Sequence, residues 1–236
     1  GYDLDWKGDY YVEEYLAPAI EAIERASKDV YGDPQKIKIL LGSMNPYNRQ
    51  NIEFLRNVME RKFTGRRAPT LAGEPVWKHI DVLTVHYMFG GERTVQRMQG
   101  YVDDYLRTGK IDGIWMTEDH GRAGKGPVTM IDRGFRYMAW VARNKLDANQ
   151  ARLVWWGDGA RKPGGSAREA EQLLGDFLCG RTIYFSERSG DDGHVYVISD
   201  GLDSETNRIL VALVPSKDSE LDFRDVRLGL PEDIPH

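Results

Sequence analysis

Two hydrophobic periods alternate along the first 178 residues, one helical and one extended. Apolar residues recur at spacings of three and four in the segments that we predict as helices, which are 10–26, 50–63, 92–108, 128–143 and 167–178. Short apolar runs between them predict strands, at 37–42, 80–87, 112–117 and 151–156. Strands that are apolar on both faces and alternate with helices are typical of a parallel sheet covered by helices.

The pattern changes near residue 180. Three extended runs are separated there by turns rich in Gly, Asp and Ser, and they are 181–186, 194–199 and 208–214. Short strands joined in this way predict antiparallel hairpins. We therefore expect an α/β domain over 1–178 and a small antiparallel β domain over 179–236.

The predicted parallel strands end in polar or aromatic side chains. The clearest case is 113–121, where Gly-Ile-Trp-Met-Thr-Glu-Asp-His-Gly passes from buried strand to acidic and imidazole groups. Enzymes built as (β/α) barrels place their catalytic residues at such strand ends. A complete barrel has eight strands in about 250 residues, so four strands predict half of a barrel or slightly more.

Composition excludes several classes of function. The 236 residues are 41% hydrophobic, which suffices for one sizeable core, and the net charge is -5. The 32 basic residues are dispersed among 37 acidic ones, so no basic stripe forms for nucleic acid, and no apolar run reaches the length of a membrane span. We expect a soluble protein, either cytoplasmic or secreted.

Metal and cofactor sites are also disfavoured by the sequence. Cys179 is the single cysteine, which excludes an internal disulfide and a thiolate metal cage. The five histidines form neither a helical pair nor a short-spaced cluster. We therefore expect no metal and no cofactor.

The strand ends, taken in order, resemble the retaining glycoside hydrolases of the (β/α)8 clan that includes the family 5 and family 39 enzymes. The resemblance covers roughly residues 10–215, including a β module directly after the barrel. The similar motifs fall on the fifth, sixth, seventh and eighth strands of the clan: 37–43, His86-Tyr87, 117–121 and Trp155-Trp156. The resemblance implies the later half of a (β/α)8 TIM-type barrel.

The resemblance also implies a reaction, the hydrolysis of glycosidic bonds in an oligosaccharide, polysaccharide or glycoside by double displacement. Glu118 would be the nucleophile, and His86 or Tyr87 would donate a hydrogen bond that keeps it ionised and aimed. The other substrate-binding residues that we expect are Trp155, Trp156, Asn45 and His120.

Two departures from the clan pattern bear on activity. Asp119 and His120 place two residues between Glu118 and the glycine, where the clan usually has one. The clan's acid/base glutamate follows an asparagine at the end of strand four, and no Asn-Glu pair occurs in this chain. We therefore expect the first four strands to precede Gly1, which makes the chain an incomplete piece of its parent enzyme.

Each candidate residue also has an ordinary structural interpretation. Glu118 is then a solvated loop carboxylate, His86 a satisfied core histidine, and the two tryptophans core anchors. Asn45 is then a turn residue. Asp158, which could replace the lost acid, is then a turn aspartate. Two other functions stay open: a carbohydrate-binding or scaffold barrel without catalysis, and an unrelated α/β-barrel enzyme. The sequence leaves the sugar, the linkage and the oligomeric state undefined.

Overall fold

A computed structural model describes residues 4–90, 92–119, 127–155, 184–190, 193–199 and 209–215. The chain divides into two compact units, the first made of Gly1–Asp119 and Leu146–Trp156 and the second of His120–Lys145 and Gly157–His236. The domain boundary expected at 178/179 and the helix expected at 167–178 lie outside the described residues.

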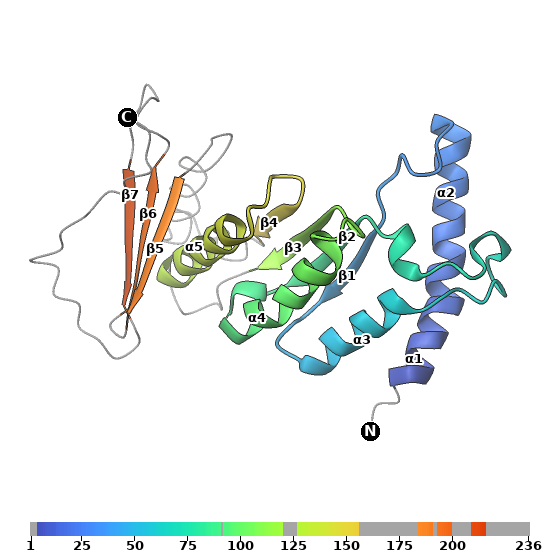
Figure 1. The fold of residues 1–236 in the computed structure, drawn as a ribbon, viewed down its shortest axis with the longest axis horizontal. Coiled ribbons are helices and arrows are strands. Elements are labelled where there is room, and N and C mark those ends of the chain that lie inside the picture. Colours follow the sequence, from blue (N-terminus) through green and yellow to red (C-terminus); the bar gives the residue numbers. More distant parts are fainter. Residues whose placement is uncertain are drawn as a thin grey trace, which may run out of the picture. The chain divides into compact units, whose positions relative to one another are not determined.

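The first unit is an α/β fold in which four parallel strands alternate with helices (Figure 1). Each strand pairs with the next one along the chain, and the order is β1 (Leu40–Met44), β2 (Val82–His86), β3 (Gly113–Asp119) and β4 (Ala151–Trp155). This confirms the prediction of four adjacent parallel strands, whose carboxyl ends therefore share one edge of the sheet.

Strand β1 begins later than the predicted residue 37, because the backbone before it bonds to side chains. The Ile37 N–H donates to Ser27 Oγ at 3.2 Å, and the Ile39 N–H donates to Asp81 Oδ2 at 2.6 Å. These donors are therefore used outside the parallel ladder, which starts at Leu40.

The first predicted helix is longer than expected and contains a π-helical turn. It runs through α1 (Leu4–Tyr11), the π-helix η1 (Val12–Leu16) and α2 (Ala17–Tyr31). The Ala17 N–H donates to the Val12 carbonyl, five residues back, just before Pro18, which has no N–H to continue the ladder. Gly32, at φ 74°, ends α2 in the left-handed conformation that glycine adopts readily.

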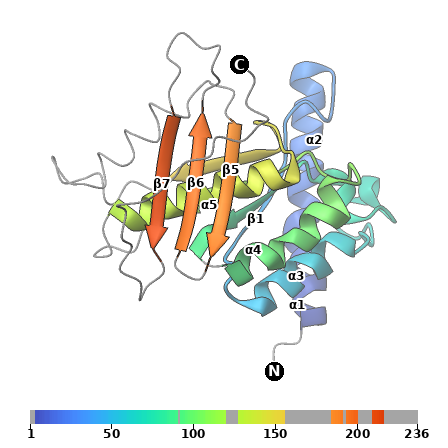
Figure 2. The ribbon, with the colours of Figure 1, turned by 60° about the vertical axis from the view of Figure 1, so that its left-hand side comes forward.

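Helices α3 (Arg49–Glu60) and α4 (Glu92–Tyr101), the latter extended by the π-helix η5 (Val102–Leu106), lie side by side in both views (Figures 1 and 2). Helix α3 contacts β1, and its apolar stripe is buried, with Ile52, Leu55, Val58 and Met59. The rings of Tyr101 and Tyr105 stack at 5.6 Å, and the Tyr101 hydroxyl donates to the Ile52 carbonyl. Burial raises the pKa of both phenols, which therefore stay neutral in the core.

The second unit contains α5 (Pro127–Asn144) and an antiparallel sheet of three strands that lie side by side (Figure 2). The strands are β5 (Tyr184–Gly190), β6 (Gly193–Ser199) and β7 (Ile209–Pro215), and α5 contacts β5. This confirms the antiparallel pairing predicted after residue 180, although β5 extends to Gly190 instead of ending at 186. That these strands belong to a separate domain stays a prediction.

Candidate functional site

The carboxyl ends of β2 and β3 bring Glu118 together with His86 and Tyr87. The strand register places His86 opposite Glu118. The Tyr87 hydroxyl donates to Glu118 Oε1, and His86 Nδ1 lies 3.4 Å from Glu118 Oε2. The side chains of His86 and Glu118 are 22% and 26% exposed, so the carboxylate is partly enclosed and still reachable. The predicted meeting of these residues at one edge is confirmed, whereas their catalytic roles stay predictions.

The backbone of Tyr87 is held in an unusual conformation that serves this contact. Its φ is 56°, in the left-handed region that a bulky residue seldom adopts. The Tyr87 N–H donates to the Glu118 carbonyl at 2.9 Å, so Tyr87 is hydrogen-bonded to Glu118 through both its main chain and its side chain. The ring of His86 meets the ring of Tyr87 edge to face at 5.9 Å. Strained conformations persist where their surroundings fix them, and such positions cluster at functional sites.

A register irregularity in β3 selects Glu118 for this position. Val85 pairs with Met116 but His86 pairs with Glu118, so β3 contains one extra residue, Thr117. Bulges of this kind re-aim the side chains that follow them. The Thr117 hydroxyl is buried and has no hydrogen-bond partner among the described residues. The irregularity thus turns the carboxylate, and not the hydroxyl, toward His86.

The end of β1 shows a similar distortion at Gly42 and Ser43. A Cβ on Gly42, whose φ is 134°, would lie 2.2 Å from the Thr84 carbonyl oxygen, so only glycine fits this close approach. Ser43 is the extra residue of β1; its φ is 59°, and its N–H donates to Thr84 Oγ1 at 2.8 Å. The end of β1 is therefore fixed to β2 beside the Glu118 site.

The remaining predicted site residues are placed only in part. Asn45 Oδ1 accepts the Tyr47 N–H at 2.9 Å, so its side-chain oxygen serves the turn after β1, and its role toward substrate stays a prediction. The backbone of Trp155 pairs with Asp119 at the same edge. Trp156, His120 and Asp158 lie outside the described residues.

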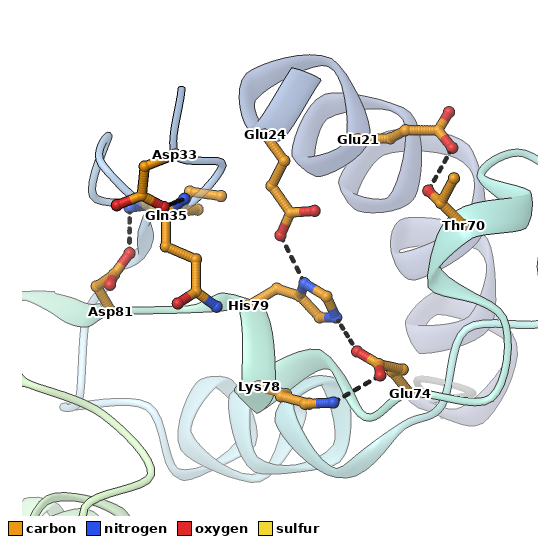
Figure 3. Close-up of polar contacts among 10 residues, drawn as sticks. Glu21, Glu24, Asp33, Gln35, Thr70, Glu74, Lys78, His79 and Asp81 are labelled. Carbon is orange, nitrogen blue, oxygen red and sulfur yellow. Dashed lines mark hydrogen bonds and ion pairs between the residues drawn. The ribbon is translucent and has the colours of Figure 1, made fainter. Parts of the chain in front are cut away.

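The opposite edge of the sheet holds a cavity of about 260 Å³, lined by the segments that lead into β1, β2 and β3. Its wall includes His79, whose Nδ1 lies 2.7 Å from Glu24 Oε1 and whose Nε2 lies 2.9 Å from Glu74 Oε2 (Figure 3). Lys78 Nζ donates to the other Glu74 oxygen at 2.6 Å. The polar groups are paired with one another by hydrogen bonds, and residues at this end of a (β/α) barrel usually serve stability. We interpret this cluster as structural.

Sequence reasoning missed the two residues that shape the loop after β1. Arg97 of α4 donates from Nη1 to the carbonyls of Pro46 and Tyr47, at 2.9 and 2.6 Å. No local signal distinguishes Arg97 from the other arginines of the chain, because its partners lie about 50 residues away. Tyr47 could have been found, because an aromatic residue directly after Asn-Pro lies in a predicted turn and is therefore exposed.

Three further observations concern metal sites, membrane spans and related proteins. The described part of the chain contains no cluster of three or more His, Cys, Asp or Glu side chains able to hold a metal ion. None of the described helices is both long and apolar enough to cross a bilayer. No family model matches the chain, and a comparison with curated proteins finds no match. The strand pairing shows a parallel α/β fold, and no family is identified.

Proposed function

We propose that this chain carries the nucleophile side of a retaining glycosidase active site, with its four parallel strands as strands five to eight of a (β/α)8 barrel. The observation that carries the proposal is the Glu118 carboxylate at the carboxyl end of β3, bound by the Tyr87 hydroxyl and approached by His86. Chemistry in (β/α) barrels occurs at this end of the strands.

The contacts of Glu118 suit a nucleophile that has to stay ionised. A hydrogen bond donated to a carboxylate favours its charged form, and Tyr87 supplies one. In double displacement, one Glu118 oxygen forms a bond to the anomeric carbon while the bond from that carbon to the leaving oxygen breaks. Water then attacks the same carbon, the bond from that carbon to the Glu118 oxygen breaks, and a second carboxyl group takes up the proton that the water loses.

The leaving group of a natural glycoside needs a proton, which a second carboxyl group about 5–5.5 Å from the nucleophile supplies in retaining enzymes. The clan's Asn-Glu motif is not in this chain. General-acid assistance is worth about 10²–10⁴-fold in rate. We therefore expect these 236 residues alone to be nearly inactive on natural glycosides. A protein that also supplied such a carboxyl group should hydrolyse them.

Reagents whose leaving group departs without a proton test the nucleophile by itself. The chain would be incubated with 2-deoxy-2-fluoro glycosyl fluorides of gluco, manno and xylo configuration, and the labelled peptide identified by mass spectrometry. We expect a glycosyl ester on Glu118 and none in the Glu118→Gln variant. Glu53→Gln is the matched control, because Glu53 forms a surface ion pair with Arg49 in α3. Label on Asp119 or Asp158, or continued labelling of Glu118→Gln, would remove Glu118 from this role.

The lack of an Asn-Glu motif also favours a second candidate, a barrel that binds carbohydrate without cleaving it. This function predicts polysaccharide binding that Glu118→Gln leaves unchanged, together with no covalent labelling by any of the three reagents. The labelling experiment therefore separates the two candidates.

A further inference from the structure

The loop between β1 and α3 exposes an aromatic ring at the carboxyl edge of the sheet. Tyr47 is 47% exposed. Among the described residues, the other exposed aromatic side chains are on the helical segment that precedes β1, at Tyr10, Tyr15 and Tyr31. Tyr47 alone in this set follows a parallel strand, and it therefore lies at the edge of the sheet that holds Glu118.

The loop that carries Tyr47 is fixed from several directions. Within the loop, Asn45 Oδ1 accepts the Tyr47 N–H at 2.9 Å, and Asn51 Nδ2 donates to the Asn45 carbonyl at 3.1 Å. From α4, Arg97 Nη1 donates to the carbonyls of Pro46 and Tyr47, at 2.9 and 2.6 Å. Pro46 itself is buried. The backbone on both sides of the ring is therefore ordered before any ligand arrives.

This arrangement has the properties of a binding platform. An exposed aromatic ring leaves apolar area in water. Covering the ring with a ligand removes this area from water, which lowers the free energy. A tyrosine has few rotatable bonds, so ordering its ring on binding costs little entropy. A loop fixed in advance lowers the cost further. A pyranose ring, with a flat face of C–H groups and hydroxyls around it, matches a flat apolar ring with a polar tip.

We propose that Tyr47 is a platform on which a pyranose unit of an oligosaccharide or polysaccharide stacks, and that Arg97 is the positioning residue that holds its loop. The ligand class rests on the proposed function, whereas the exposure of Tyr47 and the anchoring of its loop are independent of it. A sugar bound here lies at the same edge of the sheet as Glu118, so the platform extends the site beyond the unit that is attacked.

Affinity electrophoresis of the full 236-residue chain tests the platform without requiring catalysis. The gels would contain hydroxyethyl cellulose, glucomannan, xylan or laminarin, and retardation against polysaccharide concentration gives Kd. We expect at least one polysaccharide to retard the wild type. Tyr47→Ala should raise Kd by about tenfold, which is about 1.4 kcal/mol, and Tyr47→Phe should change it by less than about threefold, which is below 0.7 kcal/mol by the same relation.

Matched variants separate the platform from a general effect on the fold. Tyr31→Ala removes a tyrosine that is even more exposed, 59% against 47%, at the end of α2, and this variant should bind as the wild type does. Arg97→Gln should weaken binding, but it should have no further effect in the Tyr47→Ala background, which a purely structural role of Arg97 would not produce.

The outcomes distinguish this proposal from the proposed reaction. Equal retardation of Tyr47→Ala and the wild type, or no retardation of the wild type by any of the four polysaccharides, overturns the platform even if Glu118 is labelled. Loss of retardation in Tyr47→Ala without labelling of Glu118 supports the platform and removes the hydrolase.

Discussion

The polar side chains at the two edges of the parallel sheet differ in their hydrogen-bond partners and in their exposure. At the amino edge, His79 lies between Glu24 and Glu74, Lys78 binds the second Glu74 oxygen, and the His79 side chain is only 9% exposed (Figure 3). At the carboxyl edge, Glu118 is bound on one side by Tyr87 and remains 26% exposed. At the amino edge a largely buried histidine therefore links two partly exposed carboxylates, whereas at the carboxyl edge a partly exposed carboxylate accepts a hydrogen bond from Tyr87 and lies beside His86.

The backbone shows the same contrast. All three neighbouring strand pairs of this sheet have a register irregularity toward their carboxyl ends. Two of the three described non-glycine residues with positive φ, Ser43 and Tyr87, are at this edge. Irregular backbone costs free energy and persists where it aims side chains. The proposed function places the reacting carboxylate at this irregular edge. We therefore propose that the carboxyl edge serves function and the amino edge stability, and the following predictions test that division.

The largest effect should appear when the same Glu→Gln substitution is made at each edge and the hydrolysis rates are compared. In a longer chain that also supplies the acid/base carboxylate, Glu118→Gln should lower hydrolysis of an aryl glycoside by more than about 10³-fold, the scale on which the loss of a reacting group is felt. Glu74→Gln should leave the rate per folded molecule unchanged. Steady-state kinetics, normalised to the folded fraction measured by circular dichroism, checks both. Similar rates for the two variants would contradict the division.

Tyr87→Phe should have the next largest effect, because it removes the donor to Glu118 while keeping the ring. A hydrogen bond to a charged group is worth about 1.5–3 kcal/mol, so labelling of Glu118 by the fluoro reagent should slow by roughly 10- to 100-fold. Tyr101→Phe is the control, because its hydroxyl serves the core by donating to the Ile52 carbonyl. It should lower stability by about 1 kcal/mol and leave the labelling rate unchanged. If Tyr87→Phe lowered stability and left the labelling rate unchanged, the role of Tyr87 would be structural only.

The course of the chain could be predicted from the sequence, because hydrophobic periodicity is a local property. The four parallel strands, the helices between them and the meeting of His86 with Glu118 all follow from periodicity and from the rule that parallel strands end at one edge. The later antiparallel strands followed from their turn residues in the same way.

The irregular features could not be predicted, because they depend on contacts between distant segments. Neither serine nor tyrosine signals a left-handed backbone, yet Ser43 and Tyr87 adopt it under the hydrogen bonds made with Thr84 and Glu118. The extra residue at Thr117 appears only when β2 and β3 are paired. The His79 cluster likewise joins α2 to a segment some 50 residues later. The hydrophobic pattern of the sequence therefore locates the carboxyl edge of the sheet. The register of strand pairing decides which side chains lie together there.

His79→Ala should be the most destabilising of the histidine substitutions at the two edges. It leaves Glu24 and Glu74 without the ring that bridges them, in a place where the side chain is 9% exposed. We expect a loss of roughly 2 kcal/mol in the free energy of unfolding, measured by urea denaturation at pH 7. His86→Ala, which removes a 22% exposed ring with a 3.4 Å contact to Glu118, should cost clearly less. Equal losses would mean that the carboxyl edge is as important for stability as the amino edge.

The smallest effect concerns pH and the Glu74 carboxylate. The hydrogen bond from Lys78, with a smaller contribution from His79, holds the pKa of Glu74 below its ordinary value of 4.5. A lowered pKa in the folded state means that the carboxylate adds stability above the unfolded-state value and loses it as the pH falls through the folded-state value. The advantage of the wild type over Glu74→Gln should therefore be present at pH 7, at below about 1 kcal/mol because the pair is near the surface.

Urea denaturation of both proteins at pH 7 and pH 3 measures this advantage. It should shrink at the lower pH, because the unfolded state then binds a proton at Glu74 more readily than the folded state does. Repeating the pair in a Lys78→Met background removes the main cause of the lowered pKa, so the pH dependence should weaken there. An advantage that is equal at both pH values, or greater at pH 3, would show that the Lys78–Glu74 pair does not stabilise the amino edge through its charge. The amino edge would then be stabilised by His79 and Glu24, through the 2.7 Å contact between them.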